Sequence, residues 1–356
     1  MRVLIVDDSP IVRMLLRSVM EGSGLQVREA ADGEQALRVL ASFTPDIITM
    51  DVHMPGMDGY ETTARILERY ALPVVVLTAS SNAKDASTAM RALEAGALAV
   101  LEKPVGPHCA DFEIRVNDLL RTLLNLAQVK IVRRPYAPSS SASRALLPNQ
   151  EFSPAQPRLV AIAASAGGPA ALKTLLAELV PGLPWPLLLA QHISAGFLDS
   201  FRDWLASLSM MPVQLAIDGQ RLSPGVLYLA PETYHLGVDA NLLARLEKGT
   251  HNTPFCPSAN HLFHSVAQSF ANRAIAIQLS GMGRDGAEGM AELHRQGAMT
   301  IAQEPTSAVI DAMPLAAINL QAAKMVLAPE AIATLLNTLA SRSTSSGTAP
   351  GGEGSC

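Results

Sequence analysis

The sequence predicts two α/β domains in series, each built on a doubly wound and mainly parallel sheet. First, 356 residues exceed the length of one typical domain. Second, short apolar runs alternate with segments of helical periodicity in both halves of the chain, which is typical of βα units. Third, a stretch rich in Pro and Ser interrupts this pattern between residues 126 and 157, as a linker would.

The first domain is expected to span residues 1–125. Its apolar runs of four to six residues predict buried strands, and its segments with apolar residues every three or four positions predict helices. The expected strands are 2–6, 46–50 and 73–78, with a weaker run at 97–102, and the expected helices are 11–21, 33–43 and 61–70.

The second domain is expected to span residues 158–341, and residues 342–356 are expected to form a disordered tail because they contain almost nothing apolar. Three apolar runs, each followed by a turn and a helical pattern, predict further parallel strands. These runs are 158–164, 186–191 and 274–280, whereas residues 213–246 are more typical of hairpins.

Composition excludes several classes of protein. The formal net charge of -5 and the lack of a basic recognition helix argue against binding to nucleic acid. No apolar stretch approaches the roughly 18 residues that a membrane-spanning helix needs, and the N-terminal segment lacks the features of a signal peptide. Three widely spaced cysteines offer no zinc or disulfide motif. We therefore expect a soluble, cytoplasmic protein that does not insert into membranes.

Five polar residues lie at the carboxyl ends of predicted strands of the first domain. Because the carboxyl ends of parallel strands line one crevice, we expect these side chains to converge. Three are carboxylates, which provide the oxygen ligands that Mg²⁺ prefers, and Asp51 is the candidate acceptor of a phosphoryl group. The alternative is that the acidic residues only cap helices. The five residues are Asp7, Asp8, Asp51, Thr78 and Lys103.

The motifs VDDSP, ITMDVHMPGMDGYE, VVLTAS and LEKP resemble the response-regulator receiver family over about the first 125 residues. The resemblance implies a flavodoxin-like domain with a five-stranded parallel sheet. It implies that a histidine kinase phosphorylates Asp51, that Mg²⁺ binds Asp7, Asp8 and Asp51, and that Thr78 and Lys103 sense the phosphate. Val100 stands where many receivers have a switch Phe or Tyr, so the usual aromatic rearrangement cannot occur there.

Three residues of the second domain also follow predicted strands. Ser165 follows residues 158–164, His192 follows 186–191, and Asp285 lies beyond 274–280 in a glycine-rich turn. A serine nucleophile needs an imidazole to take its proton, and the imidazole needs a carboxylate to fix its tautomer. Glycines around Met282 allow backbone N–H groups to approach an oxyanion. Together these residues predict acyl transfer.

Each of these residues also has a simpler interpretation. The sequence around Ser165 matches only half of the GxSxG pattern, and a turn of small residues could equally bind an anion. The alternative function is therefore a non-enzymatic response regulator whose second domain binds a nucleotide or a protein partner. Neither partner would require His192 or Asp285.

The motifs AIAASAGGP, QHISAGF, CPSANHLFHS, LSGMGRDGAEGM and AQEPTSAVIDAMP resemble the catalytic domain of the CheB family of chemotaxis protein-glutamate methylesterases. The resemblance implies hydrolysis of glutamyl methyl esters on chemoreceptors, and deamidation of receptor glutamines, without a cofactor for the esterase chemistry. It implies catalysis by Ser165, His192 and Asp285, with the backbone N–H of Met282 in the oxyanion hole. We also expect the unphosphorylated receiver to cover the serine site.

Overall fold

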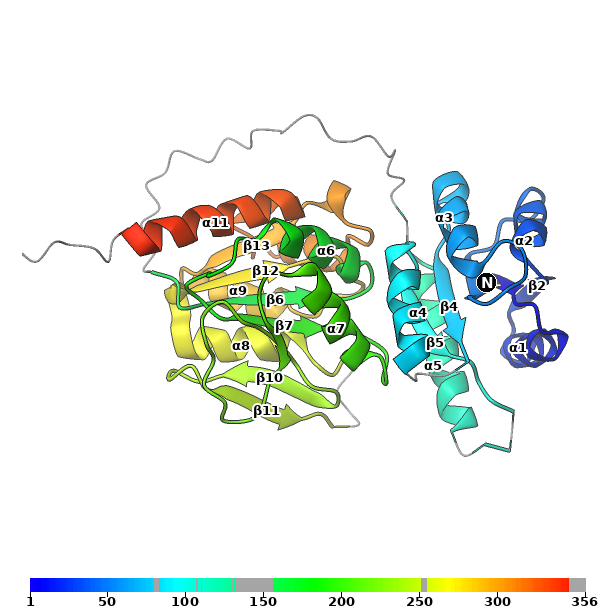
Figure 1. Cartoon of the computed structure of the whole chain (residues 1–356), viewed down its shortest axis with the longest axis horizontal. Coiled ribbons are helices and arrows are strands. Elements are labelled where there is room, and N and C mark those ends of the chain that lie inside the picture. The colour runs from blue at the N-terminus through cyan, green and yellow to red at the C-terminus, as the bar shows by residue number, and fades with distance from the viewer. Residues whose placement is uncertain are drawn as a thin grey trace, which may run out of the picture.

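The computed structural model consists of two α/β domains (Figure 1). It describes residues 1–79, 83–106, 108–109, 111–129, 131, 156–250 and 255–345. Most of the predicted linker and residues 346–356 of the predicted tail lie outside the described residues.

The first domain has a five-stranded parallel sheet in the order β2-β1-β3-β4-β5, which confirms the predicted fold class. Its strands are β1 (Arg2–Val6), β2 (Gln26–Ala30), β3 (Ile47–Asp51), β4 (Val74–Thr78) and β5 (Ala99–Glu102). Its helices are α1 (Pro10–Gly22), α2 (Gly33–Leu40), α3 (Gly59–Tyr70), α4 (Ala83–Glu94) and α5 (Phe112–Leu126). The sequence did not reveal β2 by an apolar run, because this edge strand alternates between exposed and partly buried residues and only its last residue, Ala30, is buried.

The second domain has a seven-stranded parallel sheet in the order β14-β13-β12-β6-β7-β9-β8. Its strands are β6 (Leu159–Ala164), β7 (Leu187–Gln191), β8 (Val213–Leu215), β9 (Leu227–Leu229), β12 (Ala274–Gln278), β13 (Met299–Gln303) and β14 (Met325–Leu327). Its α-helices are α6 (Gly168–Glu178), α7 (Leu198–Leu208), α8 (Ala259–Phe270), α9 (Ala287–Arg295), α10 (Ala312–Asn319) and α11 (Pro329–Ser345). Two 3₁₀ turns, η1 (Ala271–Arg273) and η2 (Pro305–Ser307), complete it. Helix α11 thus continues four residues beyond the expected domain end at residue 341.

The prediction of hairpins over residues 213–246 was partly wrong. Only β10 (Tyr234–Val238) and β11 (Ala244–Lys248) pair as an antiparallel hairpin, whereas β8 and β9 join the main sheet in parallel. Residues 216–226 connect β8 to β9 and are long enough to cross over between parallel strands. In the sequence, two short strands separated by turn residues are compatible with either a hairpin or a parallel pair.

The central strand β6 separates two hydrophobic layers, because alternate side chains of a strand point to opposite faces. Val160 and Ile162 belong to an apolar cluster that includes residues of α6, α7 and α11. Leu159 and Ala161 belong to a second cluster that includes residues of α8, α9 and α10. The sheet is therefore covered on both faces, and the loops at its carboxyl edge are free to carry a site.

Helix α4 of the first domain packs against α6 and α7 of the second (Figure 1). At this contact one carboxylate oxygen of Glu94 accepts hydrogen bonds from Lys173 Nζ at 3.1 Å and from Trp204 Nε1 at 3.0 Å. Partial burial opposes ionisation of Glu94, but these two donors outweigh it and lower the pKa of the carboxyl below its usual value. The contact therefore favours the ionised carboxylate.

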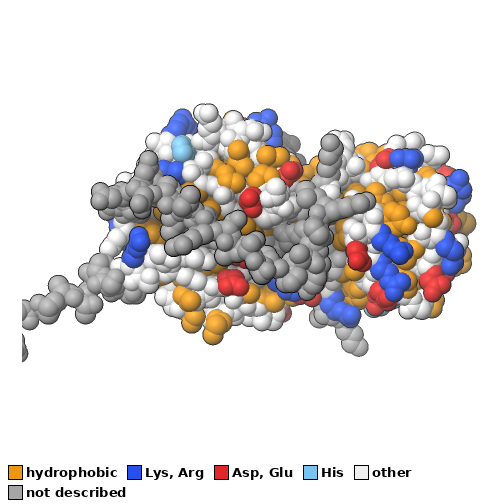
Figure 2. Space-filling model, turned by 90° about the horizontal axis from the view of Figure 1, so that it is seen from above, with side chains coloured by type: hydrophobic (Ala, Val, Ile, Leu, Met, Phe, Trp, Pro, Cys, Tyr) orange, Lys and Arg blue, Asp and Glu red, His pale blue; other side chains and the backbone are white. Residues whose placement is uncertain are grey.

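The surface view in Figure 2 shows acidic and basic side chains intermingled on the first domain. A single-sign surface of the kind that binds nucleic acid is not present on the described residues of the face shown. None of the helices in the described ranges combines the length and the apolar character needed to span a membrane.

Candidate active site

The first domain brings the predicted acidic residues together. Carboxylate oxygens of Asp7, Asp8 and Asp51 lie within 4.8 Å of one another at the carboxyl ends of β1 and β3. Asp7 and Asp51 are buried and Asp8 is exposed, so the cluster opens to solvent on one side. Three hard oxygen donors at this separation fit Mg²⁺, which binds few protein carboxylates and keeps several waters.

Lys103 lies within ion-pair distance of two of these carboxylates. Its Nζ is 2.7 Å from Asp7 Oδ2 and 3.0 Å from Asp51 Oδ2. Burial raises the pKa of Asp51, and the attraction of Lys103 offsets this only in part. The buried Thr78 ends β4 beside this group, and its carbonyl accepts the Lys103 N–H at 2.7 Å. All five predicted residues therefore lie at the carboxyl edge of the first sheet.

Val100 is buried within β5, three residues before Lys103. Because an aliphatic side chain is packed at this position, the rotation of an exposed aromatic ring is not available here. Any signal from Asp51 to the second domain must use other contacts.

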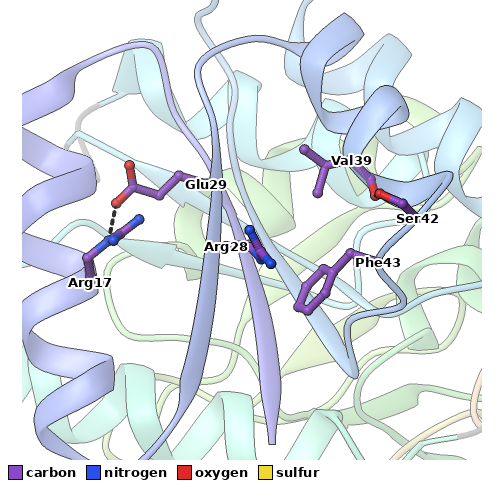
Figure 3. Close-up of a pocket in the computed structure, with 6 residues that line it drawn as sticks. All are labelled: Arg17, Arg28, Glu29, Val39, Ser42 and Phe43. Carbon is purple, nitrogen blue, oxygen red and sulfur yellow. Dashed lines mark hydrogen bonds and ion pairs between the residues drawn. The ribbon is translucent and has the colours of Figure 1, made fainter.

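A surface cavity of about 330 Å³ lies at the opposite edge of the first sheet (Figure 3). The cavity borders the edge strand β2, whereas α4 and α5, on the other side of the first domain, lie toward the second domain. Its lining residues are Arg17, Arg28, Glu29, Val39, Ser42 and Phe43. Glu29 is already paired with Arg17 at 2.6 Å, and none of the five predicted residues lines the cavity.

Ser165 lies at the carboxyl end of β6 and is 8% exposed. Its N–H donates to the Ser280 carbonyl at 3.0 Å, and its carbonyl accepts the N–H of Gly168 at 2.8 Å, so the turn before α6 is fixed on both sides. Gly167 has a φ of 76°, and a Cβ there would lie 2.5 Å from Ser280 Oγ. The turn therefore requires glycine both for its backbone angle and for its close packing.

His192 and Asp285 form a direct pair. His192 Nε2 lies 2.9 Å from Asp285 Oδ2, and both side chains are largely buried. Burial of Asp285 opposes ionisation, but the hydrogen bonds from His192 and from the backbone of Asn260 and Ala259 outweigh it and lower the pKa of the carboxyl. The ionised Asp285 accepts a hydrogen bond from Nε2–H, which leaves the His192 Nδ1 lone pair without a partner in the described structure.

The N-terminus of α8 holds Asp285 in place. Asp285 Oδ1 accepts hydrogen bonds from Ser258 Oγ and Asn260 N, each at 3.0 Å, and Oδ2 accepts one from Ala259 N at 2.7 Å. The positive end of the helix dipole and three donors stabilise the carboxylate. Sequence reasoning missed this role of Ser258, although a serine directly before a helical pattern is a typical N-cap signal.

Phe255 stacks on the His192 ring, with centroids 4.6 Å apart and planes 3° from parallel. The sequence analysis did not identify this residue, because nothing in the local pattern indicates what an aromatic ring in a loop will contact. The stacking covers one face of the imidazole and restricts its rotation.

The loop that contains Met282 packs directly beside Ser165. A Cβ on Gly281 would lie 2.8 Å from Ser165 Cβ, so only glycine allows this approach. The Gly281 N–H donates to the Ile310 carbonyl at 3.1 Å, which fixes the loop. The structure thus places Ser165, the His192–Asp285 pair and the Met282 loop at one edge of the sheet.

This arrangement defines a class of protein: a response regulator with a cluster of three carboxylates in one domain and a serine, a histidine and an aspartate of the serine-hydrolase type in the other. Residues 3–110 match the family model of the response regulator receiver domain, and residues 160–336 match that of CheB methylesterase. The chain belongs to the CheB family of protein-glutamate methylesterase/protein-glutamine glutaminases.

Relatives resemble the chain over nearly its full length. A protein-glutamate methylesterase/protein-glutamine glutaminase of Hahella chejuensis is 49% identical over 95% of this chain and 98% of its own. One from Syntrophus aciditrophicus is 40% identical over 95% and 98% of the two chains. The crystal structure of the Thermotoga maritima CheB methylesterase catalytic domain is 30% identical, covers 52% of this chain and 99% of its own, and has a TM-score of 0.50.

Proposed function

We propose that this chain hydrolyses glutamyl methyl esters of chemoreceptors, and deamidates receptor glutamines, under the control of phosphorylation. The observation that carries the proposal is the His192 Nε2–Asp285 Oδ2 pair at 2.9 Å beside the strand end that bears Ser165. The names of the relatives support the same two activities.

In the proposed reaction His192 acts through Nδ1, because Nε2 is committed to Asp285. Nδ1 takes the Ser165 hydroxyl proton as Oγ attacks the ester carbonyl. The Oγ–carbon bond forms, the bond to the methoxy oxygen breaks, and Nδ1 returns the proton to release methanol. Water then attacks the acyl-enzyme by the same route and restores Ser165.

The negative charge that develops on the carbonyl oxygen requires nearby donors. We assign this role to the backbone N–H of Met282, and the close packing of Gly281 against Ser165 supports the assignment. Asp285 stabilises the imidazolium that forms transiently, and its four hydrogen bonds keep it ionised and oriented.

Asp51 is the proposed phosphorylation site, with a chemotaxis-type histidine kinase as donor. Asp7, Asp8 and Asp51 would hold Mg²⁺, which supplies positive charge to the phosphoryl group when bound. Lys103 and Thr78 are the proposed sensors of the phosphate, and the two ion pairs of Lys103 support its part.

We propose that the first domain restrains the second in the unphosphorylated state. One apolar cluster includes Leu119 and Leu123 of α5 together with Met282 and Ile310 of the second domain. The partly buried Ala166, next to Ser165, packs on the same cluster. Contact so close to the nucleophile supports the expectation that the receiver covers the site.

We also propose a receiver over residues 1–125, a linker over 126–157 and a catalytic domain that starts at residue 158 and runs to the end of α11 at Ser345 rather than to residue 341. A location in the cytoplasm is part of this proposal, because both the kinase and the receptor segments to be modified are expected there.

The test is incubation with methyl-labelled chemoreceptor in membranes, with methanol release as the readout. We expect wild type to release methanol faster with a phosphodonor and Mg²⁺ than without them. Ser165→Ala should abolish release in both conditions, and Asp51→Ala should abolish only the acceleration. Release that persists in Ser165→Ala would contradict the proposal.

A further inference from the structure

Two buried glutamines flank the strand that carries the nucleophile. Gln191 ends β7 and Gln278 ends β12, the two strands that pair with β6 on either side. In the sheet register Gln191 lies opposite Ala164 and Gln278 opposite Ala163. They are 4% and 0% exposed, so neither is available to solvent.

The Gln191 side-chain amide links the backbone of Ser165 to the backbone of His192. Its Nε2 donates to the Ser165 carbonyl at 3.0 Å and to the His192 carbonyl at 2.8 Å. Carbonyl oxygens only accept hydrogen bonds, so the NH₂ group, and not the oxygen, must face both residues. One planar group therefore sets the separation between the backbones of Ser165 and His192.

Gln278 makes an equivalent link on the other side. Its Nε2 donates to the Asp285 carbonyl at 3.1 Å and to the Met313 carbonyl at 2.9 Å. The Met313 N–H in turn donates to the Gly281 carbonyl at 2.9 Å, next to Met282. This glutamine therefore connects the carboxylate loop to the segment that holds the Met282 loop.

Both glutamines incur a cost in stability. Gln191 Oε1 and Gln278 Oε1 are buried without a hydrogen-bond partner in the described structure. Each fits only because the facing residue is a glycine, since a Cβ on Gly168 or Gly286 would lie 2.8 Å or 2.9 Å from the oxygen. A buried acceptor left unpaired is unfavourable, so two such positions beside one site indicate a function other than packing.

We infer that Gln191 and Gln278 are positioning residues, which fix the distances among Ser165, His192 and Asp285 through backbone carbonyls. The inference rests on the proposed function and deepens it. Neither glutamine side chain is required to touch substrate. Small errors in the alignment of reacting groups lower the rate strongly, so the loss of either link should reduce turnover without weakening substrate binding.

The first experiment compares Gln191→Leu with wild type in methanol release. Leucine has a similar size and removes both donors. We expect kcat to fall on the order of tenfold to a hundredfold, with KM changed less than about twofold. Thr300→Val is the control, because Thr300 is equally buried in the same sheet and accepts the Lys324 N–H at 3.1 Å. It should shift the unfolding temperature but leave kcat unchanged.

A second variant covers the case in which Gln191→Leu does not fold. Gln191→Glu keeps the shape, and its protonated carboxyl retains one O–H donor, whereas its ionised form has none. The ratio of its kcat to that of wild type should therefore fall as the pH is raised. A ratio that does not change with pH would overturn the inference.

The outcomes separate the inference from the function it rests on. If wild type releases no methanol that depends on Ser165, the proposed function fails. If wild type is active and folded Gln191→Leu matches its kcat, or if Thr300→Val loses kcat equally, only the positioning role fails. A fall in kcat confined to Gln191→Leu supports the role.

Discussion

Glu94 offers a direct way to release the second domain from the first. Its carboxylate accepts one hydrogen bond from Lys173 and one from Trp204 across the contact between the domains. The side chains of Glu94 and Lys173 are 33% and 50% exposed, so solvent weakens the ion pair to about 1 kcal/mol at most. The bond from the Trp204 indole contributes about 1 kcal/mol.

Replacing Glu94 by Ala removes both interactions. This should destabilise the closed arrangement, in which the first domain packs on the second and restrains it, by about 1–2 kcal/mol. An energy of this size shifts a two-state equilibrium by a factor of about 5–30. We therefore expect methanol release by the unphosphorylated Glu94→Ala variant to rise several-fold, toward the rate of phosphorylated wild type but not beyond it. The variant should consequently respond less to a phosphodonor.

The assay is the initial rate of methanol release from methylated receptor, without and with a phosphodonor. Glu68→Ala, an exposed glutamate on α3, is the control for removal of a surface charge and should behave as wild type. If Glu94→Ala keeps the low basal rate of wild type while wild type is still activated by phosphorylation, the contact through Glu94 does not restrain the enzyme.

Three further predictions concern the two sites. Ser258→Ala removes the N-cap of α8 and a hydrogen bond to Asp285. The free energy of unfolding should therefore fall by about 1 kcal/mol, and kcat should fall severalfold. An unchanged unfolding free energy together with an unchanged rate of methanol release would contradict this. Because the folded-state pKa of Asp285 is lowered, its ionised form stabilises the fold above the unfolded carboxyl pKa of about 4, and this contribution disappears as the pH falls through the folded value. The difference in unfolding free energy between wild type and Asp285→Asn should therefore shrink in acid, and a constant difference would refute the assignment. Chelation of divalent metal with EDTA should abolish activation by a phosphodonor but leave basal release intact, and loss of both would show that the esterase chemistry itself needs metal.

The sequence predicted those features that follow from strand order and alternation. Asp51 ends the buried strand β3 of the first domain, whereas Ser165 and His192 directly follow the buried strands β6 and β7 of the second, and the carboxyl ends of parallel strands meet at one edge of a sheet. Their places at the carboxyl edges of the two sheets were therefore predictable from their positions in the pattern.

Features that depend on packing across the sheet could not be predicted. The support of Asp285 by Ser258 joins a loop after β12 to the start of α8, and the stacking of Phe255 on His192 joins two loops. Hydrophobic periodicity describes which face of an element is buried, but it does not describe which polar group meets which. The same limitation led to hairpins being expected where β8 and β9 are parallel.

The glutamines at the ends of β7 and β12 illustrate a further limit. In the sequence, Gln191 and Gln278 read as ordinary polar residues that terminate an apolar run. Their role depends on which amide atom faces which carbonyl, and this information exists only in the folded chain.

The central claim is that Ser165, His192 and Asp285 act together as one catalytic group. The rate at which a fluorophosphonate labels Ser165 tests this claim most directly. We predict that the probe attaches to Ser165 in wild type, as located by mass spectrometry. His192→Ala should label far more slowly, and Ser165→Ala should not label at all. Equal labelling rates in wild type and His192→Ala, or attachment of the probe elsewhere in wild type, would contradict the account.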